Sequence, residues 1–146
     1  MSQKTNDERV QGVNDKRAED AYQFISEISA TNKNLDDEVK QQKANKEFRS
    51  LARSFPTMVQ NNGLNVAIAF LLSKTDGPHP KLYKRLGSWL EGMDWLKEYK
   101  NLGLMKKIVK LSRDEYRLTS QEVMAYSSWV KRFAEGRWNK DGEEKE

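Results

Sequence analysis

The chain of 146 residues contains no cysteine, one histidine and three prolines, and it has no long apolar run. The absence of cysteine excludes disulfides and thiolate metal sites, and it is typical of proteins in reducing compartments, so we expect a cytoplasmic protein. No stretch of about 18 apolar residues is present, so no transmembrane helix and no membrane partner are expected. The polar start, MSQKTNDERVQG, lacks the apolar region of a secretory signal.

The sequence also lacks a recognisable catalytic constellation. The single histidine, His79, lies between two prolines in a turn, and no nucleophile or orienting partner is evident near it. Two carboxylate pairs, Asp36–Asp37 and Asp114–Glu115, are adjacent on expected helices, so their side chains diverge by about 100° and do not converge on a metal ion. No phosphate-binding glycine motif is present. We therefore predict no enzymatic activity, no metal and no cofactor.

Helical spacing of apolar residues recurs along the chain, whereas strand-type alternation is scarce. This pattern predicts an all-α fold, a compact single-domain bundle of about five to seven helices. The helical domain is expected at 9–138, between a flexible N-terminal tail at 1–8 and a charged, mobile C-terminal tail at 139–146. The predicted helices are 9–30, 36–54 with a continuation to 60, 64–73, one beginning at Pro80, short segments near 95–99 and 104–111, and 120–138.

Local signals refine these boundaries. Pro56 predicts a kink or restart within the second helix, because proline lacks the amide donor. Gly63, after Asn61 and Asn62, is expected to end that helix in a left-handed conformation. The next segment, 64–73, is apolar on all sides and is expected to be buried all round. Thr119 and Glu122 match a capping box at the start of the last helix.

Positive charge is concentrated in the central and C-terminal part of the chain. The formal net charge is +4. Residues 1–47 carry 8 basic and 10 acidic side chains, residues 48–140 carry 17 and 8, and residues 141–146 carry 1 and 4. An ordinary solvated surface mixes signs more evenly, so the excess over 48–140 favours a polyanionic partner.

Four predicted helices carry basic residues opposite their apolar stripe. The groups are Lys46/Arg49/Arg53, Lys81/Lys84/Arg85, Lys106/Lys107/Lys110/Arg113 and Lys131/Arg132. Arginine matches phosphate geometry better than lysine does, which makes Arg49 and Arg53 the strongest candidates. No base-reading motif accompanies these residues, so contact with the sugar-phosphate backbone is favoured over sequence readout.

The run KEFRSLARSFPTMVQNNGLNVAIAFLLSK (46–74) resembles the signature of the small helical subunit of the type III-B CRISPR RNA-guided effector, the Cmr complex. The stretches LYKRLGSWL (82–90) and YRLTSQEVMAYSSWVKRFAEGRW (116–138) are similar to the same family. The resemblance spans roughly 9–138. It implies a compact all-α subunit that is not itself the nuclease, stacks head to tail in two or three copies, and lies beside larger subunits of the complex.

The resemblance also implies a basic face that holds guide RNA and target RNA, chiefly along the target strand. It transfers this role to Arg49, Arg53 and Lys74 in the matching run, and to Lys131 and Arg132 in the WxKRF pattern. The helical wheel adds Lys81, Lys84 and Arg85. The acidic excess of 1–47 suggests contact with a neighbouring subunit or solvent.

The alternative from another class is an autonomous nucleic-acid-binding regulator. A helix-turn-helix reader needs a short turn before an exposed recognition helix. Here the candidate turn, Asn61–Gly63, leads into an apolar helix instead, which disfavours that interpretation. A nuclease would need convergent carboxylates or histidines, which the sequence does not show.

Overall fold

A computed structural model describes residues 12–145, so the expected tail at 1–8 and the start of the first predicted helix lie outside the described part of the chain. Its elements are α2 (Val13–Lys33), α3 (Glu38–Asn62), α4 (Leu64–Leu72), α5 (Pro78–Leu90), the 3-10 helix η1 (Asp94–Tyr99), α6 (Leu104–Ile108) and α7 (Arg113–Arg137). The all-α prediction is confirmed.

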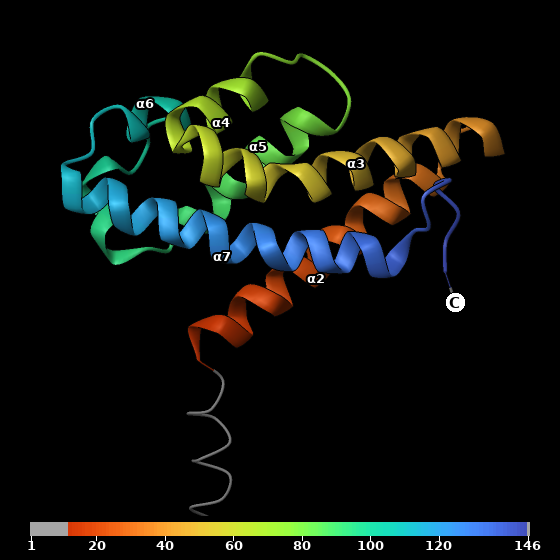
Figure 1. Ribbon diagram of the computed structural model, residues 1–146, viewed down its shortest axis with the longest axis horizontal. Helices are drawn as coiled ribbons and strands as arrows, with labels where there is room; N and C mark the ends of the chain where they lie inside the picture. Colours follow the sequence, from red (N-terminus) through yellow and green to blue (C-terminus); the bar gives the residue numbers. More distant parts are fainter. Residues whose placement is uncertain (1–11, 146) are drawn as a thin grey trace, which may run out of the picture.

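The three long helices form the body of the molecule. α3 and α7 run side by side along its longest axis, and α2 lies against α7 (Figure 1). The shorter helices α4 and α5 pack on α3, and α6 packs on both of them. The aromatic rings of Phe24, Phe48 and Trp138 meet edge to face where the long helices join, with centroids 5.4 Å and 6.0 Å apart. Trp138, the residue that follows α7, is fully buried, so the long helices share one core.

The last helix begins at Arg113, earlier than the predicted Ser120. Its capping box is made by Ser112 and Glu115, which exchange hydrogen bonds through side chain and backbone. Thr119 lies inside the helix and is buried. The sequence contains two overlapping candidates, SRDE and TSQE. The first forms the cap because Thr119 instead accepts a hydrogen bond from the indole of Trp95 at 2.9 Å.

α3 continues through Pro56 to Asn62, so the expected continuation is present and the helix does not restart. The proline ring is buried, and packing of its apolar surface offsets the missing backbone hydrogen bond. Gly63 ends the helix with φ of 91°, as the positive-φ expectation requires. Its ψ of 160° is extended, however, so the conformation is not left-handed helical.

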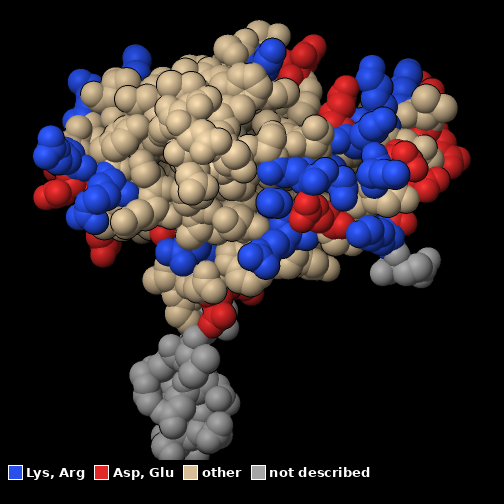
Figure 2. Space-filling view, in the orientation of Figure 1, with Lys and Arg blue, Asp and Glu red and all other residues tan. Residues whose placement is uncertain are grey.

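α4 is not buried all round. Its core side is formed by Leu64, Ala67, Ile68 and Leu71. Val66 and Leu72 are 52% and 51% exposed, because neighbouring helices cover only one side of α4. Figure 2 shows a broad surface without charge over this part of the molecule, which matches the absence of any charged residue from 54 to 73.

The described C-terminal residues, 139–145, fold back onto α2 and α3. The side-chain amide of Asn45 donates to the carbonyl of Gly142 at 3.0 Å. The carboxylate of Glu144 pairs with Lys33 at 3.4 Å and accepts from Ser29. The sequence of this segment is charged and short, so these partners could not be anticipated from it.

Candidate nucleic-acid interface

The eight predicted RNA-binding residues fall on two sets of elements. We call Arg49 and Arg53 of α3 with Lys131 and Arg132 of α7 the α3–α7 track. The others lie at the end of α4 and on α5: Lys74, Lys81, Lys84 and Arg85. The fold therefore places the predicted residues in two groups with different surroundings.

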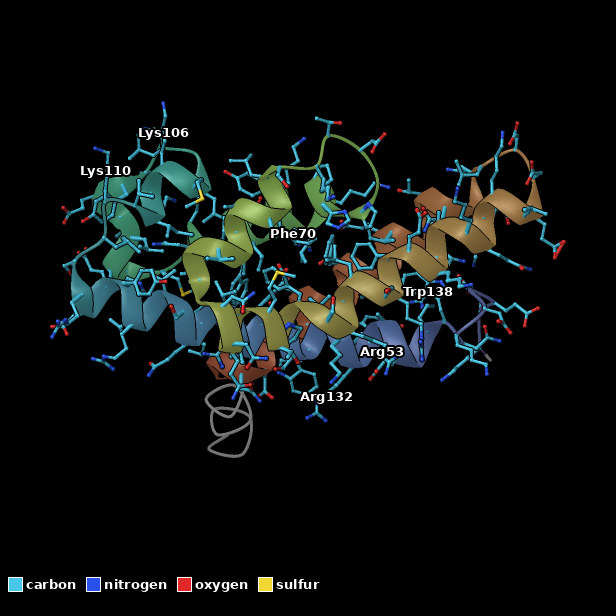
Figure 3. The ribbon with its side chains drawn as sticks, turned by 45° about the horizontal axis from the view of Figure 1, so that its top comes forward. Arg53, Phe70, Lys106, Lys110, Arg132 and Trp138 are labelled. Atoms are coloured by element: carbon cyan, nitrogen blue, oxygen red, sulfur yellow. The ribbon has the colours of Figure 1, made fainter. Side chains whose placement is uncertain are left out.

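The α3–α7 track spans two adjacent helices. Arg53 pairs with Glu135 of α7 at 2.9 Å, and the two side chains are 55% and 33% exposed. Arg132 precedes Glu135 by less than one helical turn, so it lies on the same side of α7 as the partner of Arg53. Figure 3 shows the two labelled arginines on adjacent helices. Arg132 is exposed and makes no ion pair among residues 12–145. The half-buried Lys131 likewise has no ion-pair partner in that range.

Arg49 is less available for contact with RNA than the sequence suggested. Its side chain is half-buried, and its Nε donates a hydrogen bond to the carbonyl of Trp138 at 3.0 Å. This bond satisfies a carbonyl at the end of α7, where a cation is also favoured by the helix dipole. Arg49 therefore joins α3 to α7 rather than simply facing solvent.

Figure 2 shows Lys and Arg side chains gathered over the facing parts of α3 and α7, with acidic side chains among them. The surface is basic but not uniformly so, since Glu135 neutralises part of the charge of Arg53. Exposed pairs of this kind contribute at most about 1 kcal/mol, so the side chain of Arg53 can exchange its partner for a phosphate.

Arg85 makes ion pairs with carboxylates of α2 and does not lie on the outer face of α5. Its Nε donates to Asp20 at 3.0 Å and its Nη1 to Glu27 at 2.8 Å, and its side chain is only 19% exposed. Its guanidinium also lies over the ring of Phe24. Burial disfavours the charged form, but the hydrogen bond to Asp20, together with the electrostatic effects of Tyr126 and Asp20, outweighs burial and raises the pKa of Arg85. Arg85 therefore fastens α5 to α2.

The three lysines of the second group are exposed. Lys74, Lys81 and Lys84 make no ion pair among the described residues. Together they line a pocket of about 390 Å³ whose other walls are aliphatic or aromatic. Lys74 also lies over the ring of Phe70, 5.5 Å from its centroid.

Two polar residues are buried against expectation. Lys107, predicted on an outer face, is 1% exposed because the short helix α6 packs against both α4 and α5. Glu122, predicted as part of a cap, is buried and accepts two hydrogen bonds of 2.7 Å from Arg17 and one of 2.7 Å from the indole of Trp89. Burial opposes ionisation, but the bonds from Arg17 and Trp89 lower the pKa of Glu122 overall.

His79 lies in the first turn of α5 and packs edge to face on Phe70, with centroids 5.1 Å apart. Burial, reinforced by the charge of Lys74, lowers its pKa. No group of three or more potential metal-ligating side chains gathers within residues 12–145. None of the helices described is long and apolar enough to cross a membrane.

These features define a small all-α protein with a basic surface. The family model of the CRISPR-associated protein Cas_Cmr5 matches residues 13–137. The CRISPR system Cmr subunit Cmr5 of Thermus thermophilus is 30% identical over 89 residues, which cover 61% of this chain and 73% of that protein. The crystal structure of a Cmr5 family protein from the same organism superposes with a TM-score of 0.65, at 25% identity, over 85% of this chain and 96% of that one.

The chain belongs to the Cmr5 family of CRISPR-associated proteins. The resemblance to the small subunit of the type III-B Cmr effector, which rested on residues 46–74 and 116–138, is thereby confirmed.

Proposed function

We propose that this protein is a non-catalytic subunit of a Cmr effector complex in antiviral defence, and that its α3–α7 track holds the guide–target RNA. The observation that carries the proposal is that Arg53 of α3 pairs with Glu135 of α7 and that Arg132 lies on the same side of α7 as Glu135, in a member of the Cmr5 family. The cations would contact phosphates and reduce the repulsion between closely held strands.

In this proposal, sequence specificity comes from base pairing between guide and target, because the track offers point charges and no base-reading groups. The partners are guide RNA, target RNA, the other Cmr subunits and further copies of this chain arranged head to tail. The setting is the cytoplasm. The catalytic groups would belong to other subunits.

The structure offers little support for an autonomous regulator. The helix that follows the turn at Asn61–Gly63 is α4, and of its exposed residues, Asn65, Val66, Ala69 and Leu72, only Asn65 carries a polar side chain. A recognition helix needs polar or basic residues at such positions.

The experiment compares two pairs of charge removals in the assembled complex. Arg53→Ala with Arg132→Ala removes two charges from the track. Lys106→Ala with Lys110→Ala removes two exposed charges at one end of the molecule, away from the track (Figure 3). The first pair is expected to weaken target RNA retention and to reduce the slope of log affinity against log salt by roughly 1 to 2. The second pair should leave both quantities unchanged.

Equal effects of the two pairs, or no effect of either, would refute the assignment of the track. The non-catalytic part is checked separately by incubating the isolated chain with target RNA and divalent metal ions. Cleavage by the isolated chain would overturn that part of the proposal.

A further inference from the structure

The pocket between α4 and α5 combines an apolar floor with a basic rim. Leu71, Leu72, Pro80 and Tyr83 form the floor, and Lys74, Lys81 and Lys84 form the rim; we call this surface the lysine pocket. Leu72 is half exposed there. The hydroxyl of Tyr83 is already used, because it accepts a hydrogen bond from the amide of Met105 at 3.0 Å.

The chemistry of the lysine pocket fits a protein segment better than a nucleic acid. Phosphates would satisfy the three ammonium groups, but they would leave the aliphatic floor uncovered. Bases bind mainly by stacking on aromatic faces, and the floor offers only one fixed aromatic ring. The best match is a segment that carries carboxylates together with aliphatic side chains.

Such a segment is present in this chain, at the turn between α2 and α3. Residues 35–39 read Leu-Asp-Asp-Glu-Val; we call them the acidic tip. Leu35 and Val39 are 38% and 78% exposed and flank the three acidic residues of the tip. The carboxylate of Asp36 is exposed and held only by a surface pair with Lys40 at 3.2 Å.

We propose that the acidic tip of one copy docks into the lysine pocket of the next copy. The inference rests on the proposed function in one respect, the head-to-tail association of copies, and it assigns the two surfaces that meet. The exposed carboxylates of Asp36 and Glu38 face the lysines of the rim, and the exposed Leu35 and Val39 cover the apolar floor beside Leu72. Because the two surfaces differ, the contact is heterologous and can extend into an open row of copies.

The placement of the two surfaces supports this arrangement. The acidic tip lies at one end of the longest axis, where α2 meets α3, whereas the lysine pocket lies at the junction of α4 and α5 (Figure 1). Each copy therefore presents both halves of the contact at separate places. Lys74, Lys81 and Lys84 then bind a neighbouring copy, and RNA contact is left to the α3–α7 track.

Disulfide cross-linking tests the contact directly, because the chain has no cysteine of its own. Val39→Cys with Leu72→Cys is expected to give covalent multimers of this chain in the assembled complex under mild oxidation. The matched control is Val39→Cys with Val109→Cys, since Val109 is 63% exposed but lies outside the pocket. Multimers at equal yield in the control, or none in the first variant, would overturn the proposal.

Charge reversal adds a test of complementarity in the cross-linking background. Lys81→Glu with Lys84→Glu, or Asp36→Lys with Glu38→Lys, should each lower the cross-linked fraction roughly tenfold or more. All four reversals in one chain should restore it. Asp37 is kept because its side chain caps α3, and melting curves check that each variant folds. Failure of the combined variant to recover would count against the contact.

Two outcomes separate this inference from the proposed function. Native mass spectrometry of the wild-type complex counts the copies, and a single copy would sink head-to-tail association and this contact together. If several copies are present but Lys81→Glu with Lys84→Glu lowers RNA retention and leaves the cross-link intact, the pocket binds RNA and the inference fails alone. The Arg53 and Arg132 experiment is unaffected by either result.

Discussion

At the scale of single residues, burial of charge distinguishes the structural cations from the available ones. Arg17 and Arg85 sit against carboxylates in partly buried pairs, whereas Arg132 is exposed and has no ion-pair partner within residues 12–145. All three arginines lie within helices that the sequence predicted. Only the neighbours in space determine whether a guanidinium stabilises the fold or remains free for a phosphate.

The buried pair of Arg17 and Glu122 makes a testable contribution to stability. Glu122→Gln should lower the free energy of unfolding by about 1–3 kcal/mol at neutral pH, because it leaves the partly buried Arg17 without a countercharge. The pKa of Glu122 is lowered in the folded state. The contribution of ionised Glu122 to stability is therefore fully present at pH values above 4.5, the ordinary carboxyl pKa. It is lost as the pH falls through the lower pKa of the folded state.

Denaturant melts of wild type and Glu122→Gln between neutral pH and acid check this prediction. The difference between the two proteins should shrink as the pH falls below the ordinary carboxyl value. Glu91→Gln is the control, since Glu91 is exposed and makes no ion pair within 12–145. A constant difference across the pH range would contradict the proposed role of ionised Glu122.

Of two substitutions on α4, the one that removes the smaller side chain, Ile68→Ala, is expected to destabilise the protein more than Phe70→Ala. The apolar pattern of 64–73 predicts a core position for Phe70, whose removal would then cost about 3–5 kcal/mol. Phe70 is only half-buried and packs against His79, so Phe70→Ala should cost less than that range. Ile68 is fully buried, and Ile68→Ala should cost about 2–5 kcal/mol. Chemical denaturation of both variants decides the order.

At the scale of elements, the periodicity of the sequence predicted most helices because amphipathic spacing is a local property. The ends of the helices were predicted less accurately. The segment TNKN did not end α2 at Ala30, since the helix continues to Lys33, and α5 begins at Pro78 rather than Pro80. Pro56 fits inside α3 because the surrounding core buries its ring, which local sequence cannot show.

The start of α7 is the sharpest disagreement between local signal and structure, and it gives an element-scale prediction. Ser112→Ala should destabilise the protein by about 1 kcal/mol through loss of the cap. Hydrogen exchange in the first turn, near Glu115, should increase at the same time. The matched control is Ser128→Ala. Ser128 also lies on α7, and its hydroxyl donates a hydrogen bond only within that helix, to the carbonyl of Met124. The control should leave that turn unchanged.

At the scale of the whole molecule, the closing residues tie the end of the chain to the body. Gly142 has φ of 86°, and a Cβ built there would lie 2.1 Å from the carbonyl oxygen of Gln42. Gly142→Ala should therefore displace residues 139–145 from α3. We expect a loss of about 1–3 kcal/mol and faster hydrogen exchange in that segment.

Gly136→Ala is the matched control, because Gly136 has no atom near the added Cβ and lies within α7. It should leave exchange in 139–145 unchanged. Equal protection in the Gly142→Ala variant would show that the segment does not depend on this close approach.

The amino-acid sequence by itself determined the fold class, the family and the basic character of the surface. These follow from apolar spacing, from residues 46–74 and 116–138, and from the excess of cations over 48–140, all of which are properties of the chain. The tertiary structure alone decided which cations remain available. Arg85 and Lys107 are covered and Arg49 is engaged by the carbonyl of Trp138, because their partners come from helices distant in sequence.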